Sequence, residues 1–174
     1  YRGEERMQPM TICRHWALAL LLALAAGPAL ADPPSGYPFL AYDEGLRQAE
    51  AEDKRIFLYF GRYGCGWCEK TNKETFSDPE LHDRLVENYI LVYVDAESGE
   101  RLTLPSGERV TEMELGARLN VFATPVFAFL EPDGEVIFKA PGYKTVADFV
   151  AFDRYVREGH YRDQALGEFL KGQS

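Results

Sequence analysis

The 174-residue sequence has few cysteines, few histidines and no excess of positive charge. Its formal net charge of −9 argues against general nucleic-acid binding, because an acidic surface repels phosphate backbones. Three cysteines are too few for a disulfide framework. His82 and His160 lack ligand spacing to a cysteine pair, so we expect neither a metal site nor a cofactor. Nothing is repetitive or Gly/Ser-rich, and the length indicates one globular domain.

The sequence also lacks an apolar run long enough to cross a bilayer, which takes about 20 residues. Its longest run, Trp16–Ala26, follows Arg14 and precedes the small-residue segment Ala29–Ala31. A basic residue, a short apolar core and an Ala-x-Ala site are typical of a secretory signal peptide. We therefore expect residues 1–31 to be a signal peptide that is cleaved after Ala31. The alternative is an uncleaved membrane anchor.

Loss of the expected signal peptide would remove Cys13 and leave two thiols, Cys65 and Cys68, in the sequence Cys-Gly-Trp-Cys. The apolar run Ile56–Phe60 before them predicts a buried strand, and Glu69–Thr75 after them predicts a helix. The N–H groups at a helix start favour negative charge, so a thiolate at Cys65 would be stabilised. Cys68 lies about one helical turn later, within reach of Cys65.

The cysteine pair has two interpretations from the residues alone. It could be a structural staple, or it could be a working redox pair. So small a loop removes little chain entropy, because the stabilisation by a disulfide grows with loop length. The position at a helix start favours the redox interpretation.

The remaining pattern predicts alternating helices and strands behind a Pro-rich, extended lead-in at residues 32–39. The domain is expected to span residues 40–174 and to end in a helical extension. In chain order we expect a helix at 42–54, a strand at 56–60, a helix at 69–75, a helix starting at 77–80, a strand at 89–94, a surface excursion with a small hairpin at 96–110, a helix at 111–119, a strand in the second half of 121–130, a strand at 136–138, and helices at 145–158 and 163–170. This order predicts an α/β fold with a central mixed β-sheet flanked by helices on both faces.

Three features together resemble the thioredoxin superfamily over residues 40–158. They are the strand–Cys-x-x-Cys–helix unit, the Thr124–Pro125 pair before a strand, and the closing hairpin and helix. The resemblance implies the thioredoxin fold and a thiol–disulfide oxidoreductase with a Cys65–Cys68 redox disulfide. It also implies that Pro125 is cis and lies opposite Cys65.

The same resemblance assigns roles at the site. Cys65 would be the exposed nucleophile and Cys68 the buried resolving thiol. Thr124 would offer backbone groups to a partner chain in a β-like contact. Gly66 and Trp67 would tune the redox potential and form part of the wall of the site. Trp67 could contact partners or pack on its own domain.

A narrower resemblance links the chain to SoxW-type periplasmic thioredoxins, through residues 60–68, Phe76–Glu80, Pro141–Tyr143 and 159–162. The Phe76–Glu80 segment is also similar to the C-terminal thioredoxin-like domain of DsbD. The SoxW-like resemblance implies a reductant of protein disulfides, the expected signal peptide places it in the periplasm, and we expect a monomer. Its electrons would come from a membrane thiol transporter of the DsbD or CcdA kind. The alternatives are a DsbA-like oxidant and a non-catalytic binding module whose cysteine pair gates a partner surface.

One position departs from the superfamily pattern. Thioredoxins commonly place a buried acid six residues before the first cysteine, where it helps to deprotonate the second thiol. Here that position is Tyr59. The sequence therefore leaves the group that activates Cys68 unassigned.

Overall fold

The computed structural model describes residues 33–172, so the expected signal peptide at 1–31 lies outside the described residues. Four strands form one mixed sheet in the order β2-β1-β5-β6. β1 runs parallel to β2 and antiparallel to β5, and β6 runs antiparallel to β5. Their bounds are Ile56–Gly61 for β1, Ile90–Asp95 for β2, Val126–Leu130 for β5 and Val136–Pro141 for β6. The predicted α/β fold with a mixed sheet is confirmed.

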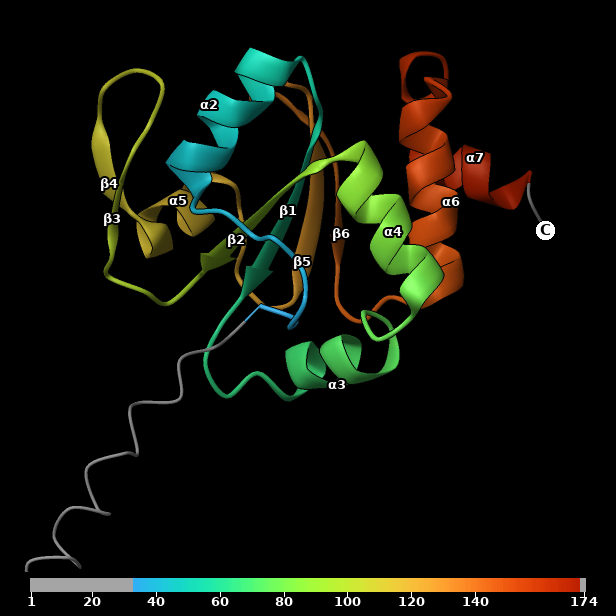
Figure 1. Cartoon of the computed structure of the whole chain (residues 1–174), viewed down its shortest axis with the longest axis horizontal. Coiled ribbons are helices and arrows are strands. Elements are labelled where there is room, and N and C mark those ends of the chain that lie inside the picture. Colours follow the sequence, from blue (N-terminus) through green and yellow to red (C-terminus); the bar gives the residue numbers. More distant parts are fainter. Residues whose placement is uncertain (1–32, 173–174) are drawn as a thin grey trace, which may run out of the picture. The chain divides into compact units, whose positions relative to one another are not determined.

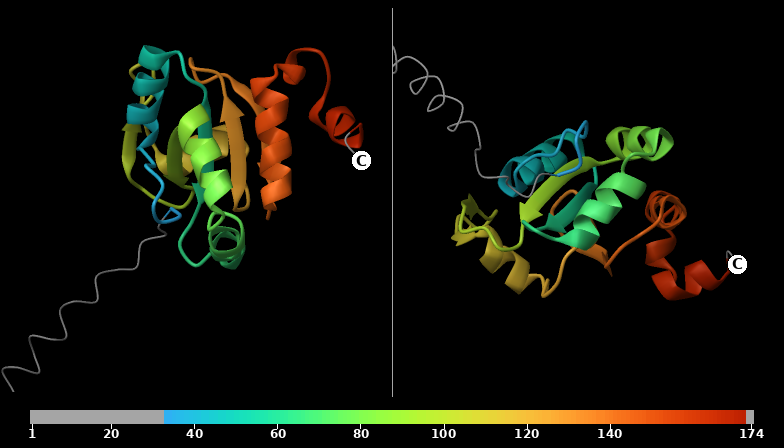
Figure 2. Two further views of the ribbon diagram at one scale, coloured as in Figure 1. Left: turned by 45° about the vertical axis from the view of Figure 1, so that its right-hand side comes forward. Right: turned by 90° about the horizontal axis from the view of Figure 1, so that it is seen from below.

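Helices cover both faces of this sheet (Figure 1). α2 and α5 contribute to the core on one face, and α4, α6 and α7 contribute to the core on the other. The helix bounds are Tyr42–Glu52 for α2, Gly66–Glu74 for α3, Pro79–Asn88 for α4, Glu112–Arg118 for α5, Val146–Arg157 for α6 and Leu166–Lys171 for α7, with a 3-10 turn at His160–Arg162. Figure 2 shows α3 at the end of the sheet, where β1 finishes. No helix between residues 33 and 172 is both long and apolar enough to cross a membrane.

The central strand β1 explains why the sheet is buried on both faces. Phe57 and Tyr59 point into the core with α4 and α6, whereas Ile56, Leu58 and Phe60 point into the core with α2 and α5. Successive side chains of a strand alternate between faces, so an unbroken apolar run supplies both cores at once. This burial fixes the strand that leads into the cysteine loop.

Side-chain caps fix the predicted helix starts. Asp78 accepts a hydrogen bond from the Leu81 N–H, with proline at the first helical position of α4. At α5 the Thr111 hydroxyl accepts from the Glu114 N–H, and the Glu114 carboxylate accepts from the Thr111 N–H. These two bonds form a capping box at the helix start.

The lead-in and the return strand differ from the sequence prediction, and α3 and α7 begin three residues before and three residues after their predicted starts. The lead-in does not stay extended, because it turns at Ser35 and Gly36, where Gly36 takes φ of +87°. It then packs against the domain, since Tyr37 is buried and its hydroxyl donates to the Phe76 carbonyl at 3.1 Å. The return strand β6 extends to Pro141, beyond the predicted 136–138. The predicted small hairpin is present as β3 (Arg101–Thr103) and β4 (Arg109–Thr111).

Candidate active site

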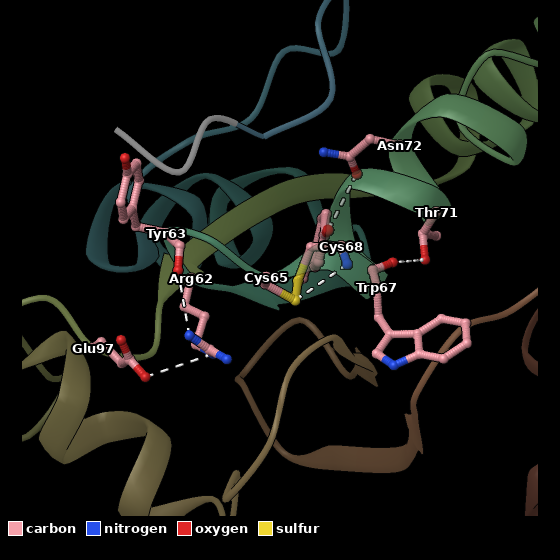
Figure 3. Close-up of a disulfide and its surroundings, with 9 residues drawn as sticks. Arg62, Tyr63, Cys65, Trp67, Cys68, Thr71, Asn72 and Glu97 are labelled. Carbon is pink, nitrogen blue, oxygen red and sulfur yellow. Dashed lines mark hydrogen bonds and ion pairs between the residues drawn. A yellow bond between two sulfur atoms is a disulfide. The ribbon is translucent and has the colours of Figure 1, made fainter. Parts of the chain in front are cut away.

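A disulfide joins Cys65 and Cys68 at the start of α3, with their Cα atoms 5.2 Å apart (Figure 3). β1 ends at Gly61, and a short loop carries the chain to Cys65, the N-cap residue of α3. Cys68 then lies in the first turn of the helix. The strand–loop–helix placement predicted from the sequence is therefore the one that the structure has.

The cap geometry bears directly on the chemistry of Cys65. Its sulfur accepts a hydrogen bond from the Cys68 backbone N–H at 3.1 Å. This N–H is one of the donors that a helix start leaves without an intrahelical partner. Once the disulfide is reduced, the same N–H and the helix dipole favour the thiolate of Cys65 over the thiol.

The prediction that Cys65 is the exposed cysteine is wrong for the disulfide form. Cys65 is 4% exposed and Cys68 is 6% exposed. The reason is the cap, because the Cys65 side chain folds back over the first turn of α3 instead of pointing to solvent. The exposed residues of this segment are Gly66 and Trp67, which lie between the two cysteines. A side chain built at Gly66 would meet no atom within 4 Å, so this side of the disulfide is open to an approaching chain.

Thr124 and Pro125 lie at the same end of the sheet as the cysteine loop. In the antiparallel register Phe60 pairs with Val126, so the residues just after β1 lie beside those just before β5. The Thr124–Pro125 peptide bond is cis. The Pro125 carbonyl accepts from the Gly142 N–H at 2.8 Å, which ties this loop to the segment after β6.

Three exposed aromatic side chains lie in the cysteine segment or in the loop before β5, and only Trp67 was predicted from the sequence. Trp67 is 59% exposed and Phe122 is 84% exposed, and Tyr63 is also exposed. Tyr63 lies two residues before Cys65, and Phe122 lies two residues before Thr124. Aromatic side chains so close to the two motifs in loop segments were the signal that could have identified them.

The Trp67 ring is held from one side by a clamp. The Lys70 ammonium lies 5.4 Å from the Trp67 ring and 4.9 Å from the Tyr143 ring. Both Lys70 and the Tyr143 hydroxyl contact the Glu74 carboxylate, at 3.9 and 3.0 Å. Trp67 thus packs partly on its own domain and still presents more than half of its surface to solvent. It can serve both of the roles that the sequence left open.

Tyr59, at the position where an acid was expected, is buried in the same core cluster as Cys65 and Cys68. Its hydroxyl donates to Asn72 Oδ1 at 3.1 Å. Burial, with a smaller contribution from Tyr93, raises the pKa of Tyr59 well above its ordinary value. The hydroxyl therefore stays protonated at neutral pH and is a hydrogen-bond donor there, not a base.

Residues 42–157 match the family described as a thioredoxin-like domain. The chain belongs to this family. The match covers both cysteines, the Thr124–Pro125 loop and all four strands of the main sheet. A thioredoxin-like domain with this cysteine pair is consistent with thiol–disulfide redox activity.

Three known proteins illustrate the similarity. Spermatogenesis-associated protein 20 of Mus musculus is 38% identical over 66 residues, which are 38% of this chain and 8% of that protein. A thioredoxin-fold protein from Helicobacter pylori has a TM-score of 0.59 and 26% identity, covering 70% of this chain and 80% of that one. A thioredoxin from Thermus thermophilus has a TM-score of 0.57 and 26% identity, covering 69% and 86%. Since this chain spans so small a part of the mouse protein, that match describes a shared segment.

Proposed function

We propose that this thioredoxin-like domain is an exported thiol–disulfide oxidoreductase that reduces disulfides of periplasmic partner proteins. The observation that carries the proposal is the Cys65–Cys68 disulfide at the start of α3, with the Cys65 sulfur accepting the Cys68 N–H. A purely structural disulfide would need only the bond between the two cysteines. A capped sulfur at a helix start also gives the reduced pair a stabilised thiolate.

The reaction has two exchange steps. The Cys65 thiolate attacks a disulfide sulfur of the partner, so a Cys65–partner bond forms and the second partner sulfur leaves with the electron pair. Cys68 then attacks the Cys65 sulfur as a thiolate. The Cys65–Cys68 bond forms, the bond to the partner breaks, and the released partner sulfur takes up a proton. The partner is reduced by two electrons and the pair is oxidised.

The remaining parts of the proposal rest on sequence. The segment 1–31, with its apolar run and Ala-x-Ala site, supports export. The similarity to SoxW-type thioredoxins supports the reducing direction and a membrane thiol transporter of the DsbD or CcdA kind as the electron source. Residues 32–39 would then lead into a monomeric domain at 40–174, with Gly66, Trp67, Thr124 and Pro125 as the wall against which the partner lies.

Insulin reduction tests this function. With dithiothreitol as electron donor, the protein should accelerate insulin precipitation, and protein alkylated after reduction should not. A redox titration against glutathione then gives the direction. A potential near −270 mV, the order of thioredoxin's, supports a reductant, and one near −120 mV, the order of DsbA's, supports an oxidant. Equal precipitation with intact and alkylated protein would leave the binding-module alternative.

The exposure of Tyr63, Trp67 and Phe122 supports a protein as the partner. Exposed aromatic side chains are enriched among residues that dominate protein interfaces, because they bury a large area at low entropic cost. Here each lies within two residues of Cys65 or Thr124, where it adds exposed apolar surface near the site. A small thiol would not need such a surface.

Trp67→Ala and Phe122→Ala should each raise the KM for insulin by about tenfold, as expected for an aromatic anchor in an interface. The rate with a small aromatic disulfide should stay within about twofold, since that substrate needs no extended surface. Steady-state kinetics with both substrates measures the difference.

Met113→Ala is the matched control, because Met113 is also exposed but lies on α5, outside the two loops that border the disulfide. Equal KM values for all three variants would show that the Trp67 and Phe122 side chains do not bind the partner. Equal losses with both substrates would point to damage at the disulfide itself.

A further inference from the structure

The chemistry proposed above requires Cys68 to ionise inside the protein. Cys68 belongs to a buried cluster that includes Phe57, Phe76 and Phe127. Apolar surroundings disfavour a thiolate unless a hydrogen-bond donor faces it. The Cys68 backbone N–H is directed at the Cys65 sulfur and is therefore not that donor.

Two other hydroxyls on α3 and just after it donate to backbone carbonyls. Thr71 Oγ1 donates to the Trp67 carbonyl at 2.8 Å, and Thr75 Oγ1 donates to the Lys144 carbonyl at 2.7 Å. Both threonines are buried, and each hydroxyl already has an acceptor in the structure. Turning either hydroxyl toward the sulfur would break the bond that it makes.

Tyr59 is placed differently. Its hydroxyl donates to a side chain, Asn72 Oδ1, and Asn72 follows Cys68 by four residues on α3. Side chains four apart on a helix are neighbours, with Cβ atoms about 5–6 Å apart. Figure 3 shows the amide oxygen of Asn72 directed toward the disulfide. The Tyr59 hydroxyl is thus bonded to the residue that lies one helical turn after Cys68, and the Tyr59 and Cys68 side chains belong to the same buried cluster.

Asn72 can release this hydrogen bond at little cost. It is only partly buried, and it lines a surface pocket of about 460 Å³ together with Pro34, Glu69, Lys73 and Phe76. Solvent in such a pocket can take over the bond to the amide oxygen. Turning the Tyr59 O–H about its C–O bond then redirects the donor.

From this placement we infer that the Tyr59 hydroxyl donates to Asn72 Oδ1 while the pair is oxidised and turns to the Cys68 sulfur when the disulfide opens. There it stabilises the resolving thiolate, and Asn72 positions the hydroxyl between turnovers. The inference rests on the proposed function. In the resolving step the Cys65–Cys68 bond forms, the Cys65–partner bond breaks, and the proton that Cys68 gave to solvent is taken up by the departing partner sulfur.

The surroundings of Tyr59 keep its hydroxyl protonated, so that it can donate a hydrogen bond. Burial and the neighbouring Tyr93 on β2 both raise the pKa of Tyr59, so its hydroxyl keeps its proton across the neutral range. Glu69 and Lys73 line the same surface pocket as Asn72, and Cys65 lies at the helix start. A charge-assisted bond from a neutral hydroxyl to a thiolate is among the stronger hydrogen bonds.

The test compares Tyr59→Phe with Asn72→Ala, each in a Cys65→Ala background that leaves Cys68 as the single thiol of the mature domain. The rate of alkylation against pH gives the midpoint of Cys68 ionisation. Tyr59→Phe should raise this midpoint by about one pH unit, a tenfold smaller thiolate fraction at neutral pH. Asn72→Ala should leave it unchanged or lower it, because the hydroxyl loses its competing acceptor.

A merely structural role for the Tyr59–Asn72 bond predicts that both variants move the midpoint in the same direction. That result, or an unchanged midpoint in Tyr59→Phe, would overturn the inference. Thermal unfolding of each variant checks that the fold is intact, and phenylalanine keeps the ring that packs on Phe76 and Phe127. The ionisation midpoint of Cys68 is measured without any disulfide substrate. Failure of the insulin assay would therefore reject the proposed function without deciding whether Tyr59 stabilises the Cys68 thiolate.

Discussion

Cys65→Ser should reduce insulin reduction to the rate of dithiothreitol alone, the largest effect on activity expected of any single substitution in this domain. A serine hydroxyl is not ionised at neutral pH and cannot form the mixed disulfide, whereas the thiolate is the attacking species. The cap adds to this loss, because the Cys68 N–H that faces the Cys65 sulfur would then face a neutral oxygen. Insulin turbidity measures the result.

Cys68→Ser should behave differently and provides the matched control. It keeps the capped sulfur of Cys65, so the first attack still occurs and the mixed disulfide accumulates. Release then depends on external thiol, and turnover should fall by roughly a hundredfold or more, since an intramolecular attack has a far higher effective concentration. Non-reducing electrophoresis should show the covalent complex with Cys68→Ser and not with Cys65→Ser. A covalent complex formed by Cys65→Ser would reverse the assigned roles of the two cysteines. Equal activity in both variants would show that the cysteines do not have distinct roles.

Much of the fold could be predicted because its determinants are local. The unbroken apolar run of β1 predicts a strand covered on both faces, and the Asp78–Pro79 start and the Thr111–Glu114 box predict helix starts. The cysteine pair and the Thr124–Pro125 pair were identified by their spacing and by family resemblance. Each of these is a pattern within a few consecutive residues.

The rest depends on contacts between distant segments, which no local pattern contains. Exposure of Cys65 was predicted wrongly because the direction of its side chain is set by the cap. The clamp on Trp67 needs Tyr143, which is far away in sequence. Tyr59 could be recognised as a missing acid, but its hydrogen bond to Asn72 required the packing of α3 on the end of the sheet.

A buried carboxylate on α6 also joins segments that are distant in sequence, because it bonds to α4. Asp153 on α6 is fully buried and accepts hydrogen bonds from Arg84 at 2.9 Å, from the Tyr89 hydroxyl at 2.9 Å and from Arg157 at 3.0 Å. Burial, followed by the charge of Asp153, raises the pKa of Tyr89, so this hydroxyl stays a donor. Two cations and one neutral donor thus compensate a single buried charge.

Replacing both Arg84 and Arg157 with methionine should cost about 3–5 kcal/mol of unfolding free energy, because the Asp153 charge would remain buried without a cation. The arginine side chains are themselves 36% and 44% exposed, so their own loss accounts for little of this cost. Domains of this kind are stable by about 5–15 kcal/mol, and the change should appear as a large fall in the urea midpoint.

Asp153→Asn separates the buried charge from the packing around it. Alone, it should cost about 1–3 kcal/mol, since the amide loses the charge-assisted bonds but fills the same space. Added to the double arginine variant, it should restore much of the lost stability, because no uncompensated charge is left inside. The rescue can be observed even if the double variant does not fold, because the triple variant is then expected to fold. Simple additivity of the three substitutions would show that the arginines act through packing and not through the carboxylate.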